Sequence, residues 1–106
     1  AKVIYYSNTT MILFKYGGVT LEFIGSIIKE QGVTFAVVLV KKQAIDNRFE
    51  AERLIQSLRM QVFHGMPVVL MAQNSGRIQT YGRNDIAKFL ANIDPRRISW
   101  KKYRKN

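Results

Sequence analysis

The chain has 106 residues, a length typical of a single domain, and its 47% apolar composition is enough to form a hydrophobic core. It carries 17 Lys and Arg residues against 7 Asp and Glu, a net charge of +10, and such a charge balance favours polyanionic partners. The lack of cysteine excludes disulfides, thiolate catalysis, iron–sulfur clusters and the usual structural zinc sites, and the lack of a signal-like or membrane-length apolar run leads us to expect a soluble cytoplasmic protein.

The N-terminal residues predict a pair of strands. Residues 2–7 and 10–17 are rich in β-branched and aromatic side chains, which favour strands. Ser7, Asn8 and Thr9 lie between them, and such residues form turns readily because their side chains bond to the nearby backbone. We therefore expect a hairpin at the start of the chain.

The next segment, residues 19–31, fits two structures. A helix is favoured by the spacing of Leu21, Ile24, Ile27 and Ile28, with Thr20 as a candidate N-cap and Gly32 as a stop. The alternation of Val19, Leu21 and Phe23 is instead typical of a strand, which would turn near Gln31 and Gly32 into the following segment. We expect the helix and keep the hairpin as the alternative.

A strand and a helix are predicted for the middle of the chain. Residues 33–40 form an almost unbroken apolar run rich in Val, which is typical of a strand covered on both faces. Asn47 and Glu50 have the spacing of a capping box, so a helix is expected to begin there. Its buried stripe should comprise Ala51, Leu54, Ile55, Leu58 and Val62.

The remaining elements follow in regular order. We expect the helix to end at His64 and Gly65, and a second buried strand to begin at Pro67 and to pair in parallel with the first. A turn at residues 74–76 should lead into an antiparallel strand over residues 77–82. The last helix is predicted to be capped by Asn84 and stopped by Asp94 and Pro95, with its buried stripe formed by Ile86, Phe89, Leu90 and Ile93.

Together these elements predict a layered α/β domain (α/β/α) with a mixed sheet of about five strands and three helices. From residue 33 onward, the order strand, helix, Pro-led strand, hairpin strand and helix resembles the second half of a thioredoxin-type fold, and small nuclease-like α/β domains share comparable stretches. The redox chemistry of thioredoxins cannot be carried over, because the chain has no cysteine. We expect one compact domain over residues 1–95, with residues 96–106 packed on it as a basic strand or tail.

The C-terminal segment DPRRISWKKYRKN, residues 94–106, is the most unusual part of the sequence. It contains six of the 17 cations, which leaves 11 cations and 7 carboxylates in residues 1–95, a net charge of +4. Such a cluster can neutralise phosphates and release counterions, and Tyr103 is the candidate for stacking on a base. Ile98 and Trp100 share one side of an extended segment, which favours burial of Trp100. Lys and Arg on an edge strand also prevent unwanted sheet pairing, so a solvated basic edge is the competing interpretation.

The sequence thus favours a non-catalytic domain that associates with DNA or RNA through backbone phosphates. The expected contact residues are Arg96, Arg97, Lys101, Lys102, Tyr103, Arg104 and Lys105, with Lys41, Lys42 and Arg83 extending the surface if they lie nearby. No cofactor, metal or membrane contact is expected, and the other expected partner is a second copy of the chain.

Two alternatives remain open. The first is a protein-interaction or self-assembling module that recruits a partner strand to an exposed sheet edge. The second is a divergent metal-dependent nuclease that uses Asp46, Glu50 or Glu22 with Lys41 or Lys42. The only histidine, His64, has no partner residues that would complete a hydrolase triad in the sequence pattern, and no nucleotide-binding glycine motif is present.

Overall fold

The computed structural model describes residues 2–6, 11–15, 18–30, 32–74 and 76–105, and side chains for residues 23–30, 32–73 and 76–103. The elements in chain order are β1 (Lys2–Tyr6), β2 (Met11–Lys15), β3 (Gly18–Glu30), β4 (Val33–Leu39), α1 (Lys42–Asp46), α2 (Arg48–Gln61), β5 (Val68–Asn74), β6 (Arg77–Tyr81), α3 (Asn84–Ala91), the 3₁₀ helix η1 (Pro95–Arg97) and β7 (Lys101–Lys105). The predicted α/β class, with a mixed sheet and three helices, is confirmed; β3 to β7 are five of its strands, and the hairpin of β1 and β2 extends the sheet to seven.

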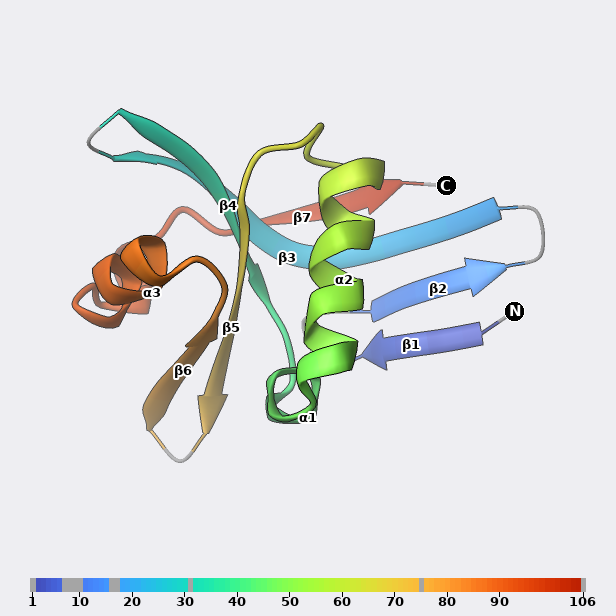
Figure 1. Cartoon of the computed structure of the whole chain (residues 1–106), viewed down its shortest axis with the longest axis horizontal. Helices are drawn as coiled ribbons and strands as arrows, with labels where there is room; N and C mark the ends of the chain where they lie inside the picture. Colours follow the sequence, from blue (N-terminus) through green and yellow to red (C-terminus); the bar gives the residue numbers. More distant parts are fainter. Residues whose placement is uncertain (1, 7–10, 16–17, 31, 75, 106) are drawn as a thin grey trace.

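The parallel pair β4 and β5 contributes most of the buried strand residues, with α1 and α2 between the two strands in the chain. Alternate residues of β4 point to opposite faces, so Ala36 and Val38 join the core beneath α1 and α2, while Phe35 and Val37 join a second core beneath α3. Figure 1 shows α2 crossing one side of the sheet and α3 lying beside β6, where its buried residues pack on the second core. The unbroken apolar run predicted this burial on both faces, and the prediction is confirmed.

Helix α2 begins where the sequence predicts. The Asn47 side chain accepts a hydrogen bond from the backbone N–H of Glu50 at 3.1 Å, which satisfies one of the free donors of the first turn. The predicted apolar stripe lies against the sheet, with Ala51, Leu54, Ile55 and Leu58 buried. A short helix that the sequence did not predict, α1, fills the connection between β4 and α2.

The helix predicted for residues 19–31 is wrong, and the alternative is correct. Residues 18–30 form the long strand β3, which pairs with β2, β4 and β7 and so places its backbone N–H and C=O groups in sheet ladders. Gly25 pairs with both Val38 and Lys101, so β4 and β7 lie on opposite edges of β3 at this point. A helix here would leave three strands without their partner.

The C-terminal third follows the predicted order with two differences. Arg83, not Asn84, occupies the N-cap position of α3, and Asn84 is already the first helical residue. After α3 the chain forms η1, and only then does it enter β7. In Figure 1, β7 lies along β3 on the side away from β2, which fixes the basic C-terminal strand at an edge of the sheet.

Candidate nucleic-acid interface

The basic C-terminal segment is held in place by local caps and by an apolar anchor. Asp94 caps η1 by accepting the backbone N–H of Arg96 at 2.9 Å, and Pro95 occupies the first turn. Ile98, directly after η1, is buried in the core beneath α3. Arg96 and Arg97, within η1, are both exposed to solvent.

Trp100 contributes to the same anchor. Its indole Nε1 donates a hydrogen bond to the carbonyl oxygen of Pro95 at 3.0 Å, and its ring packs, half-buried, against the core that includes Ile98. Ile98 and Trp100 therefore pack against the same core, as their spacing predicts. Both residues precede β7 and do not belong to it. Trp100 is a packing residue and not an open stacking platform.

The strand β7 distributes its side chains over both faces of the sheet. Lys101 and Tyr103 lie on the side of Phe23 and α2, and Lys102 lies on the opposite side. Lys101 and Lys102 are both exposed. The backbone of Arg104 and Lys105 belongs to β7, while the side chains of these two predicted contact residues lie outside the described part of the structure.

Tyr103, the residue predicted to stack on a base, packs against other aromatic rings. Its ring stacks on Phe23 with a centroid separation of 5.1 Å and meets Phe63 edge-on at 5.4 Å, so it belongs to the core beneath α2. Its hydroxyl is buried without a hydrogen-bond partner among the described residues, and burial raises its pKa above 10.0. Cross-strand pairing with Phe23 turns inward the ring that the sequence predicted to stack on a base.

Arg96 forms an ion pair with a carboxylate, whereas Arg97 forms none with the described residues. The guanidinium of Arg96 lies 2.7 Å from a carboxylate oxygen of Asp94. The hydrogen bonds from the Arg96 side chain, and then from its backbone N–H, lower the pKa of Asp94 from 3.8 to about 2. Within the described residues Arg97 and Lys101 form no ion pair; the ammonium of Lys101 lies 5.7 Å from the ring centre of Tyr103.

The three cations expected to extend this surface lie elsewhere. Lys41 and Lys42 are at the start of α1, which follows β4 on the other edge of β3 from β7, and Lys42 is paired with Asp46. Arg83 precedes α3 and binds both oxygens of Asp85, at 2.8 and 2.7 Å, which lowers the pKa of Asp85 to about 2. The structure does not join these residues to η1 and β7.

The carboxylates considered for metal-dependent cleavage are also dispersed. Asp46 pairs with Lys42, and Glu50 lies 3.9 Å from Arg53. The side chain of Glu22 is outside the described residues. Among the side chains that are described, no three of His, Asp or Glu lie close enough together to hold a metal ion. His64 is exposed and adopts a left-handed backbone conformation with φ of 50°, at the turn that follows α2.

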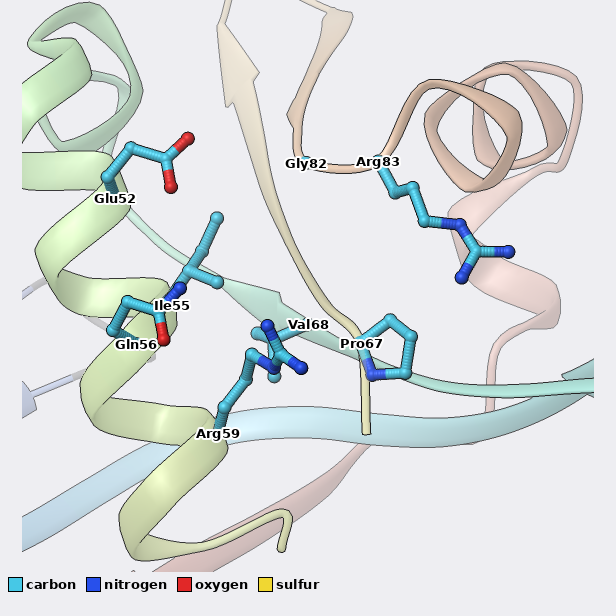
Figure 2. A pocket seen from close by; sticks show the side chains of 8 residues that line it. All are labelled: Glu52, Ile55, Gln56, Arg59, Pro67, Val68, Gly82 and Arg83. Atoms are coloured by element: carbon cyan, nitrogen blue, oxygen red, sulfur yellow. The ribbon is translucent and has the colours of Figure 1, made fainter. Parts of the chain in front are cut away.

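A cleft that the sequence did not reveal lies between α2 and the connection from β6 to α3. Glu52, Gln56 and Arg59 are spaced i, i+4 and i+7, so they share one side of α2 and line the cleft together. The cleft has a volume of about 280 Å³, and the residues that complete it are Ile55, Pro67, Val68, Gly82 and Arg83. Figure 2 shows the α2 side chains facing Gly82 and Pro67 across the opening.

The two ends of the cleft differ in charge. At one end, Glu52 accepts a hydrogen bond from the hydroxyl of Tyr81 at 2.8 Å, and this bond raises the pKa of Tyr81 above 10.0. At the other end, Arg59 donates from Nη2 to the carbonyl oxygen of Gly65 at 2.9 Å, and its Nε is buried with no partner among the described residues. Sequence periodicity shows only that these residues lie on the polar side of a helix. The cleft itself is not visible in the sequence, because its opposite wall comes from a distant segment.

Comparisons with protein families, with curated proteins and with solved structures found no match for this chain. In the described part of the chain, no helix has the length and apolar character needed to cross a bilayer.

Proposed function

We propose that the chain is a non-catalytic nucleic-acid-associating domain that contacts backbone phosphates through the exposed cations of η1 and β7. The observation that carries the proposal is the concentration of exposed cations between residues 96 and 102, two of which, Arg97 and Lys101, form no ion pair with a described residue. The proposal also includes Arg104 and Lys105, which follow in the same strand. A cytoplasmic accessory role in nucleic-acid processing fits such a domain.

The physical basis of binding is electrostatic. Each phosphate neutralised by Lys or Arg releases condensed counterions, and the affinity gained in this way does not depend on sequence but falls with salt. The rigid attachment of the segment supports the proposal, because Ile98 and Trp100 fix the backbone and the cations need not be ordered from a disordered tail. Base stacking by Tyr103 is not part of the proposal.

The test is the salt dependence of oligonucleotide binding. Fluorescently labelled single- and double-stranded DNA and RNA are titrated with the full chain between 50 and 200 mM salt. For four to six phosphate contacts on duplex DNA, the slope of log K against log salt should be about −3.6 to −5.4. A slope near zero would refute the proposal, and cleavage that requires Mg²⁺ would favour the nuclease alternative.

A protein-interaction module is the second candidate, and the outer side of α2 favours it. Phe49 and Met60 are exposed by 81% and 76%, and their spacing of i and i+11 places them on one side of the helix. Single exposed apolar side chains are common on protein surfaces, and what favours a contact surface here is that two of them share one side of α2. This candidate predicts a concentration-dependent dimer in sedimentation velocity experiments that the substitutions F49S and M60S abolish, and no binding of nucleic acid.

A further inference from the structure

The cleft between α2 and the β6–α3 connection contains a partly buried guanidinium with no carboxylate partner. Within the described residues Arg59 makes one hydrogen bond, from Nη2 to Gly65, and no ion pair. Figure 2 shows its guanidinium reaching into the space between Gln56 and Pro67, whereas the guanidinium of Arg83 extends away from α2. Arg83 is already neutralised by Asp85, so Arg59 supplies the positive charge of the cleft.

The geometry of Arg59 suits an oxyanion. A guanidinium presents planar, paired donors that match the oxygens of a phosphate, and the bond to Gly65 fixes the orientation of this plane. A partly desolvated cation without a counter-charge is costly, and an anion in the cleft would remove that cost.

The opposite end of the cleft offers acceptors and an amide. Glu52 uses Oε1 for the hydroxyl of Tyr81, which holds the carboxylate in place, and its second oxygen takes no part in this bond. Gln56 lies between Glu52 and Arg59 on the same side of the helix and can both donate and accept. Seven residues separate Glu52 from Arg59, which corresponds to about 10 Å along a helix axis.

A ligand that fits must therefore carry an anion at one end and hydrogen-bond donors about 10 Å away. The volume of about 280 Å³ is near the lower limit for small-molecule sites, and the walls between the two ends include the apolar side chains of Ile55, Pro67 and Val68. A single nucleotide has these properties: a phosphate, a planar base that suits an apolar wall, and a base edge with amino groups.

We propose that this cleft binds one nucleotide of the associated strand, with its phosphate on Arg59 and its base edge on Glu52 and Gln56. This inference rests on the proposed function, since the nucleotide would belong to the strand held by η1 and β7. Because a carboxylate accepts from the amino group of cytosine, the cleft prefers cytosine to uracil. The cleft thus adds base preference to a domain whose phosphate contacts carry none.

The test uses mononucleotides, which are too small to engage the basic surface as a strand does. Cytidine monophosphate, uridine monophosphate, cytidine and inorganic phosphate are titrated into the isotope-labelled full chain, and amide shifts in two-dimensional NMR report the site and the affinity. We expect cytidine monophosphate to shift residues lining the cleft and to bind at least tenfold more tightly than cytidine, with uridine monophosphate weaker than cytidine monophosphate. Inorganic phosphate should compete.

Three variants locate the contacts. R59Q should remove the preference for the phosphorylated ligand, R59K should retain part of it, and E52Q should reduce the preference for cytosine without loss of phosphate binding. R77Q removes one charge from the exposed start of β6, outside the cleft, and serves as the matched control. Thermal unfolding of each variant confirms that it is folded. If R59Q does not fold, R59K and E52Q still test the proposal.

The inference is overturned if cytidine and cytidine monophosphate bind equally, if the shifts lie outside the cleft, or if R77Q weakens binding as much as R59Q. Its failure is distinct from failure of the proposed function. Loss of oligonucleotide binding on substitution of Lys101 and Lys102, with unchanged binding of cytidine monophosphate, supports both ideas. Mononucleotide binding with no oligonucleotide binding supports the cleft and contradicts the basic surface.

Discussion

The ring of Tyr103 lies nearly parallel to the ring of Phe23, with an interplanar angle of 10° and centroids 5.1 Å apart. Phe63, just beyond α2, meets both rings edge-on. This group of three aromatic residues joins β7, β3 and the end of α2. The strand that carries the C-terminal cations is therefore part of the hydrophobic core and not a tail laid over it.

Substitution of Tyr103 separates packing from binding. Y103F removes a buried hydroxyl that has no partner among the described residues, so the free energy of unfolding should stay the same or rise by about 1 kcal/mol. Y103A should lower it by about 3–5 kcal/mol, as expected for a truncated core aromatic. Urea unfolding measures both, and oligonucleotide affinity of Y103F should equal that of the natural chain. Weaker binding by Y103F would show that the hydroxyl contacts the ligand.

Removal of Asp94 should strengthen nucleic-acid binding. The carboxylate of Asp94 neutralises Arg96, whose side chain is 90% exposed and otherwise available to a phosphate. D94N keeps an oxygen to cap η1 and releases the guanidinium, so affinity should rise severalfold and the salt slope should steepen by about one unit. N92D, which adds a carboxylate instead, should have the opposite effect or none; tighter binding by N92D would contradict this explanation.

The same ion pair gives a pH dependence with a defined sign. The pKa of Asp94 is about 2 in the folded chain against 3.8 for the free group, so its contribution to folding is fully present above about pH 4 and is lost as the pH falls through 2. The difference in urea midpoint between the natural chain and D94N should be constant above about pH 4 and shrink below it. The effect should be small because the pair is exposed. A difference that grows as the pH falls would contradict the assignment.

Gly25 is required where β3 pairs with two strands. A methyl group at this position would lie 2.9 Å from the carbonyl oxygen of Val37, a backbone atom that cannot move away without disturbing β4. G25A should therefore lower the free energy of unfolding by about 1–3 kcal/mol. As a control for the loss of glycine alone, G32A meets no neighbouring atom but occupies a left-handed conformation with φ of 80°, and should cost about 1–2 kcal/mol. Equal stability of G25A and the natural chain would exclude this close approach.

The sequence predicts most of the elements whose determinants are local. The capping interaction of Asn47, the apolar stripe of α2 and the buried run of β4 are each visible within a few residues. The helix predicted for residues 19–31 is wrong because Ile24, Ile27 and Ile28 fit a helix as well as a strand, and the choice depends on pairing with β2, β4 and the distant β7.

The candidate site shows the same division. The cations of the C-terminal segment are evident in the sequence, but the inward direction of Tyr103 depends on its register with Phe23. The cleft could not be predicted, because it requires Arg59 of α2 to face Gly82, and only the parallel crossover brings the two together.

The most direct test of the central claim compares two double substitutions that each remove two positive charges. K101Q/K102Q removes two cations from β7, and K41Q/K42Q removes two from the start of α1, which follows β4 on the other edge of β3. The salt dependence of oligonucleotide binding is then measured for both. We predict that K101Q/K102Q weakens binding and reduces the slope by about two units, while K41Q/K42Q leaves both nearly unchanged. Equal weakening by the two pairs would show that net charge alone governs binding and would contradict an interface on η1 and β7.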